Sequence, residues 1–149
     1  MVECRDALEL PWPERLDRVD EIRVEAREDA LTNKLILTGI FVSSFLKAYG
    51  KEVQDCARQT MVFTAIALEH YRLANDRYPS SLSELTPKYL PLVPTDPFDG
   101  EELRYRTRGG GYALYSVGAD RVDDFGQKPI PRNSVQEVPR GDIIFAIEP

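Results

Sequence analysis

The chain has 149 residues, of which 42% are hydrophobic and 30% charged, a composition typical of one globular domain rather than a disordered chain. Its formal net charge is −6, which argues against nucleic acid as a partner, because phosphate binding needs a basic surface. Residues 1–30 hold ten acidic residues against five arginines, so the remaining residues sum to only −1. The acidity is therefore an N-terminal feature.

No segment of the sequence predicts insertion of this chain into a membrane. The longest apolar run, residues 35–46, is twelve residues long and includes Thr and Ser, which is too short to span a bilayer. The first residues do not form a signal peptide and do not resemble a natural N-terminus, so we expect a fragment of a longer protein. Cys4 and Cys56 are too few for a disulfide scaffold; they could pair in an oxidising compartment or remain free thiols.

The first half of the chain is predicted to be mainly helical. Residues 1–29 are interpreted as an irregular acidic arm, in which a short helix could begin near Glu14. Residues 30–76 carry apolar residues at spacings of three and four, which predicts either two helices that meet at Gly50 or one long rod.

One stretch of this helical region, MVFTAIAL at residues 61–68, is apolar nearly all round. Val62, Ile66 and Leu73 share one face of the predicted helix, and Phe63 lies beside them. A helix that is apolar on every side is normally surrounded by protein, so we expect this part to be deeply buried.

The second half is predicted to be a loop followed by a sheet. Residues 77–100 form a proline-rich loop, in which Ser81 and Glu84 have the spacing of a capping box. Residues 101–149 contain three runs with strand-like alternation, the first two joined by a glycine-rich turn. Helices followed by a small antiparallel sheet of about three strands predict an α+β domain over residues 30–149.

The sequence does not offer the groups of a known catalytic site. His70 is the only histidine, and it lies mid-helix among packing residues, which favours a helix-surface or interface role over catalysis. There is no G-x-S-x-G or H-E-x-x-H motif. One histidine and two distant cysteines do not have the spacing of a zinc site. We therefore expect a protein without enzymatic activity.

An acidic cluster follows the second predicted strand. Asp120, Asp123 and Asp124 lie within five residues, and Asp142 precedes the last strand. Carboxylates and backbone carbonyls in an irregular loop are the ligands that calcium prefers, although the spacing differs from that of an EF-hand. Aspartate is also common in solvated turns, and composition alone favours that second interpretation.

Three segments in order resemble the globular domain of the major pseudopilin of type II secretion. They are ALEHYRLANDRYP at residues 67–79, YLPLVPTDPF at residues 89–98 and YALYSVGAD at residues 112–120. The resemblance implies a long helix packed on a small antiparallel sheet, and a calcium ion in the loop after Ser116. By position, Asp120, Asp142 and Ser116 would be its ligands. Asp123 and Asp124 match the family's loop less clearly.

The resemblance does not extend to the start of the chain. Residues 1–59 do not match the family, and the processed apolar helix that builds a pseudopilin filament has no counterpart here. The chain looks like the C-terminal part of a larger bacterial envelope protein, located in the periplasm or cell envelope, with protein partners and a role in secretion-like assembly. The alternative is an interaction or scaffolding module of the envelope unrelated to secretion.

Overall fold

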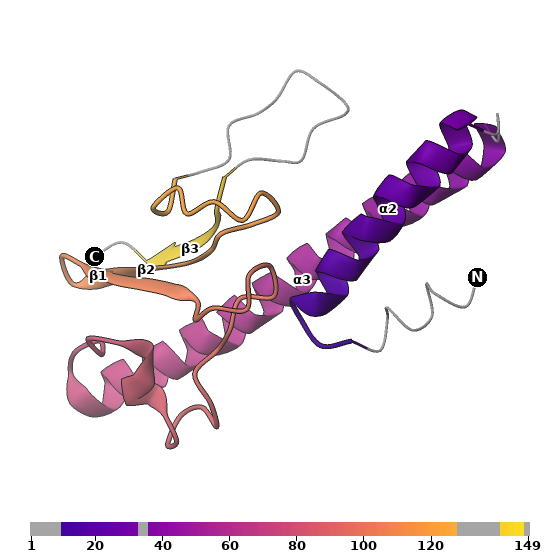
Figure 1. Cartoon of the computed structure of the whole chain (residues 1–149). Coiled ribbons are helices and arrows are strands. Elements are labelled where there is room, and N and C mark those ends of the chain that lie inside the picture. The colour runs from indigo at the N-terminus through magenta and orange to yellow at the C-terminus, as the bar shows by residue number, and fades with distance from the viewer. Residues whose placement is uncertain (1–9, 33–35, 128–140, 148–149) are drawn as a thin grey trace. The chain divides into compact units, whose positions relative to one another are not determined.

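The computed structural model describes residues 10–32, 36–127 and 141–147. The chain divides into two compact units, residues 1–53 and 54–149, and each is considered by itself. Helix α3, Ile36–Asn75, contributes residues to both units (Figure 1). Of the helices described, none is both long and apolar enough to cross a membrane.

The first unit contains helix α2, Glu14–Thr32, where the sequence predicts an irregular arm with a short helix near Glu14. The segment follows Pro11 and Pro13, and Glu14 and Asp17 lie in its first turn, where negative charge is favourable. Its many Arg, Glu, Leu and Ala residues are good helix formers. The predicted irregular arm is therefore wrong from residue 14 onward, because Pro11 and Pro13 precede the helix and do not interrupt it.

Aromatic and apolar side chains hold this unit together. The ring centroids of Trp12 and Tyr49 are 5.8 Å apart, and the guanidinium of Arg15 lies over both rings, at 5.1 and 5.4 Å. Leu16 and Val19 of α2 are buried beside them. Burial is the main reason that the pKa of Tyr49 is raised to about 12.

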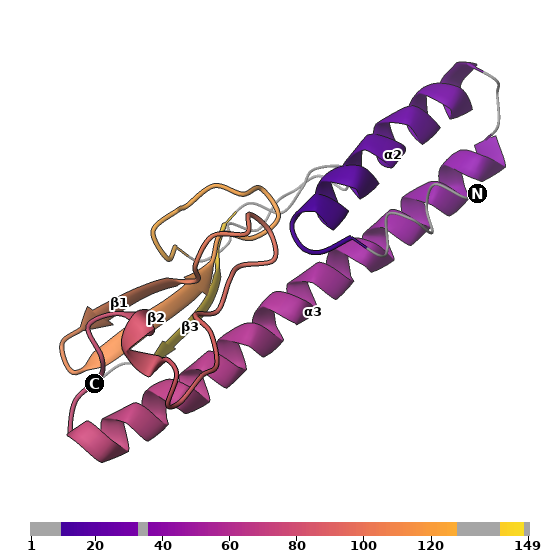
Figure 2. The ribbon, with the colours of Figure 1, turned by 60° about the horizontal axis from the view of Figure 1, so that its bottom comes forward.

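Helix α3 continues through Gly50, so the single rod is the alternative that the structure shows. Its C-terminal half packs on the sheet through Met61, Ala65, Leu68 and Tyr71, which recur at spacings of three and four (Figure 2). The expected deep burial of residues 61–68 on all sides is wrong. The sheet covers only one side of the helix.

Four apolar side chains of α3 are instead exposed, and they define what we call the apolar stripe. Their exposed fractions are 47% for Val62, 66% for Phe63, 49% for Ile66 and 70% for Leu73. An apolar pattern on every side of a helix does not by itself indicate which side meets the sheet.

The sheet has three antiparallel strands in the order β1-β2-β3, which confirms the predicted α+β class. Strand β1, Arg104–Arg108, and strand β2, Gly111–Ser116, form the predicted hairpin, with Tyr105 opposite Leu114. Strand β3, Ile143–Ile147, pairs with the other side of β2 and places Phe145 opposite Leu114. Tyr112 and Leu114 of β2 are buried in the core against α3.

The connection between α3 and the sheet contains a short 3-10 helix, η1, Leu82–Leu85. The predicted capping box is only half correct. Glu84 reaches back to accept a hydrogen bond from the backbone N–H of Ser80, at 2.7 Å. The hydroxyl of Ser81 makes no cap and shares a hydrogen bond with Ser83 instead. Leu82 and Leu85 are buried and attach this loop to the core.

Candidate functional site

A buried carboxylate, Asp96, fixes the loop before β1 to the end of β2. Its Oδ1 accepts hydrogen bonds from the backbone N–H of Phe98, at 3.0 Å, and from the hydroxyl of Ser116, at 2.9 Å. Its Oδ2 accepts one from the backbone N–H of Val117, at 2.9 Å. Burial raises the pKa of Asp96 despite these three bonds. In the sequence, Asp96 belongs to the second pseudopilin-like segment, and no pattern there indicates that it is buried.

The Ser116 hydroxyl, a predicted calcium ligand, lies within the same network. Besides donating to Asp96, it accepts a hydrogen bond from the backbone N–H of Gly118, at 3.2 Å. The side chain is fully buried. The first hydrogen bond ties Ser116 to the loop before β1 and the second to the turn that follows β2, and neither involves Asp120, Asp123, Asp124 or Asp142.

Gly118 is the point where the turn after β2 approaches the start of β3. It has a φ of +73°, and a Cβ at this position would lie 2.7 Å from the carbonyl oxygen of Gly141. Both the backbone conformation and the close approach therefore require glycine. Asp120 reinforces the approach, because its Oδ2 accepts a hydrogen bond from the backbone N–H of Gly141, at 3.3 Å.

Asp142, next to Gly141, closes the acidic loop from the other side. The carboxylate is fully buried, and it accepts hydrogen bonds from the backbone N–H of Gly126 at 2.7 Å and of Asp124 at 3.3 Å. Burial is the largest influence on its pKa, which is raised; the charges of Asp123 and Asp124 raise it further, and the backbone donors oppose them. The loop thus holds a buried carboxylate close to two others.

The remaining predicted ligands take different parts in this loop. The Oδ1 of Asp123 accepts a hydrogen bond from the backbone N–H of Phe125, at 2.8 Å, which forms a local turn. Asp124 contributes its backbone N–H to Asp142. The structure therefore connects Asp120, Asp124 and Asp142 through segments 118–126 and 141–142, while Asp123 stabilises the turn between them.

The loop fits a cation in its charge and only partly in its ligands. The raised pKa of Asp142 indicates that its surroundings disfavour the ionised carboxylate, and a nearby positive charge would stabilise that form. Calcium takes six to eight oxygen ligands. Within the described ranges, no three His, Cys, Asp or Glu side chains gather as a metal-binding group. A calcium ion here would need backbone carbonyls for most of its coordination.

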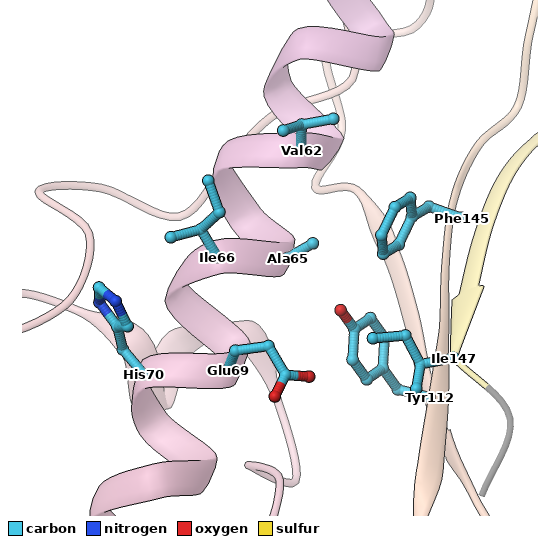
Figure 3. Close-up of a pocket in the computed structure, with 8 residues that line it drawn as sticks. All are labelled: Val62, Ala65, Ile66, Glu69, His70, Tyr112, Phe145 and Ile147. Atoms are coloured by element: carbon cyan, nitrogen blue, oxygen red, sulfur yellow. The ribbon is translucent and has the colours of Figure 1, made fainter.

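A separate groove lies between α3 and the sheet, with a volume of about 250 Å³. Figure 3 shows Ala65 and Glu69 of α3 on one side, and Tyr112 of β2 with Phe145 and Ile147 of β3 on the other. Val62, Ile66 and His70 complete its lining on the helix. His70 is exposed at this edge, as expected for a surface residue of the helix.

Comparison of the chain with known protein families, with curated proteins and with solved structures finds no match.

Proposed function

We propose that the chain provides a non-catalytic, pseudopilin-like domain of an exported or membrane-anchored bacterial envelope protein, with a role in type II secretion-like assembly. One observation carries the proposal: residues of the three pseudopilin-like segments contact one another. The ring centroids of Tyr71 and Tyr89 are 5.6 Å apart, and those of Tyr78 and Tyr112 are 4.9 Å apart. With the Asp96–Ser116 hydrogen bond, each of the three segments is joined to another one.

The geometry of the polar groups supports a structural role for them. Asp96, Ser116 and Asp142 are fully buried, and their oxygens bond backbone N–H groups or one another. A catalytic nucleophile needs a neighbouring base and access to substrate. The buried groups lack that access, and the exposed His70 lies on α3, outside this network. We therefore assign them to the stability of the loops.

Calcium is the cofactor that we propose for the acidic loop. Asp120 and Asp142 would hold the ion together with backbone carbonyls of residues 118–126, while Asp123 and Asp124 lie close enough to add charge. The ion would place a positive charge beside the buried Asp142, whose pKa is raised by burial and by the charges of Asp123 and Asp124. The aspartates would then bind the ion and hold residues 118–126 beside residues 141 and 142.

Isolation of the protein from its source organism tests the functional assignment. A tagged copy, expressed at its natural level, would be cross-linked in cells and purified from the envelope fraction, and its partners identified by mass spectrometry. The proposal predicts that components of a secretion assembly co-purify. The alternative, an envelope scaffold unrelated to secretion, draws support from the exposed apolar stripe on α3. It predicts a location in the envelope and partners outside secretion, which would overturn the proposal.

A further inference from the structure

Strand β3 forms an edge of the sheet without the usual protection of an edge strand. Its sequence, IIFAI, contains no charge, proline or glycine. Within the described part of the chain, β3 pairs only with β2, and none of these residues pairs with the other side of the strand. Proteins normally block such an edge with a lysine, a proline or a bulge, because an open apolar edge pairs with other strands.

Two residues of the apolar stripe of α3, Val62 and Ile66, lie beside the same edge. Val62 and Ile66 line the groove together with Phe145 and Ile147 of β3 (Figure 3), and Val62 and Ile66 are each about half exposed. A strand added to β3 would therefore also cover the apolar side chains of the helix. The open edge and the exposed helix residues form one continuous surface.

The groove also contains an unsatisfied polar group. The hydroxyl of Tyr112 is buried and has no hydrogen-bond partner among the described residues, and its ring lines the groove. In Figure 3 the hydroxyl points toward α3, into the space between the helix and Phe145. A buried hydroxyl without a partner is unfavourable, so an occupant that brings a hydrogen-bond acceptor would relieve this cost.

We propose that this surface is a dimer interface, in which β3 of a second copy pairs antiparallel with β3. Two identical strands that pair antiparallel are related by a two-fold axis, so this arrangement closes on itself. An uncharged, apolar strand is the best partner for this apolar edge, and β3 itself has that composition. Residues 54–149 contain 14 acidic and 11 basic residues, a net charge of −3, so the repulsion between copies that approach through this unit is small.

The available area indicates a weak dimer. One strand edge and the exposed parts of Val62, Phe63 and Ile66 can bury on the order of 1,000 Å² over both copies, at the low end of specific interfaces. We therefore expect an equilibrium between monomer and dimer at micromolar concentrations or above. This inference does not depend on the secretion proposal, because it uses only the surface of residues 54–149.

Sedimentation equilibrium of the whole chain at several concentrations tests the proposal. Ala146→Lys places a charge on the exposed position of β3, and Ile66→Lys places one on the stripe. Each should weaken self-association at least about tenfold without loss of thermal stability. Leu92→Lys is the matched control, because Leu92 is an exposed apolar residue of the 77–100 loop, and it should leave the equilibrium unchanged.

Three outcomes would overturn the proposal. The first is a chain that stays monomeric up to about 1 mM. The second is self-association that both lysine variants retain. The third is a monomeric chain that binds a synthetic peptide of residues 141–149, GDIIFAIEP, because the edge would then accept a separate strand and not a second copy. Slower amide exchange at Ile143–Ile147 as concentration rises would support the dimer.

Discussion

The hydroxyl of Ser116 donates a hydrogen bond to Oδ1 of Asp96 at 2.9 Å, and so joins the end of β2 to a loop twenty residues earlier in the chain. This hydroxyl and the backbone N–H groups of Phe98 and Val117 all donate to the fully buried carboxylate of Asp96. Asp96 therefore holds the loop and the sheet together, and its acceptor oxygens matter more than its volume.

Asp96→Asn is expected to destabilise the protein by about 1–3 kcal/mol, because its Nδ2 would face a donor that is left buried without an acceptor. Urea denaturation measures the difference in unfolding free energy. Glu101→Gln makes the same chemical change at an exposed side chain of the same loop and should shift that energy by less than about 0.5 kcal/mol. Equal effects of the two variants would contradict the assigned role of Asp96.

Gly118→Ala should lower the melting temperature, because Gly118 has a φ of +73° and its added Cβ would lie 2.7 Å from the carbonyl oxygen of Gly141. Gly50→Ala has the opposite expected effect. Its added Cβ meets nothing within 4 Å, and alanine is favoured over glycine inside a helix by about 0.5–1 kcal/mol. Scanning calorimetry of both variants checks this opposition of sign. A stabilised Gly118→Ala protein would show that the two segments do not meet there.

The stability of the loop around η1 should depend on acid pH through Glu84. A hydrogen bond from the Tyr71 hydroxyl, at 2.5 Å, and the Ser80 backbone N–H lower the pKa of Glu84 below its ordinary value of 4.5. Because the folded pKa is the lower one, this stabilisation is present above pH 4.5 and is lost as pH falls through the folded pKa.

Tyr71→Phe should therefore show a smaller loss of unfolding free energy than the parent between about pH 5 and about pH 3. Tyr89→Phe is the control, because the buried Tyr89 hydroxyl has no hydrogen-bond partner in the part of the chain that the structure describes. Urea denaturation at each pH gives the unfolding free energy, and its change with pH is compared between each variant and the parent. If Tyr89→Phe changed the slope as much as Tyr71→Phe does, the effect would not come from the Tyr71–Glu84 bond.

Sequence patterns predicted the strands better than the helices. The alternation around Tyr105, Tyr112 and Phe145 corresponds to the observed sheet, since period two arises from the strand itself. The charged segment of α2 lacked a clear apolar stripe, and its helix was largely missed. The burial of Asp96 was not predictable from its neighbours, because it is created by donors about twenty residues away.

Calcium should raise the melting temperature of the parent protein relative to the same protein in EGTA, because an ion that binds only the folded loop stabilises it. Asp142→Asn should abolish this increase, since Asp142 is the buried carboxylate of the loop. Asp76→Asn, at an exposed position after α3, should retain it. An equal melting temperature of the parent protein with and without calcium would contradict a stabilising calcium ion in this loop.

The most direct test of the proposed secretion role is a comparison of exported proteins. The gene would be deleted in the source organism, and the proteins of the culture medium quantified by mass spectrometry. A non-catalytic secretion role predicts that a subset of exported proteins is retained in the cells. Both the parent gene and a His70→Ala variant should restore export. An unchanged set of exported proteins, or restoration that fails only with His70→Ala, would contradict the account.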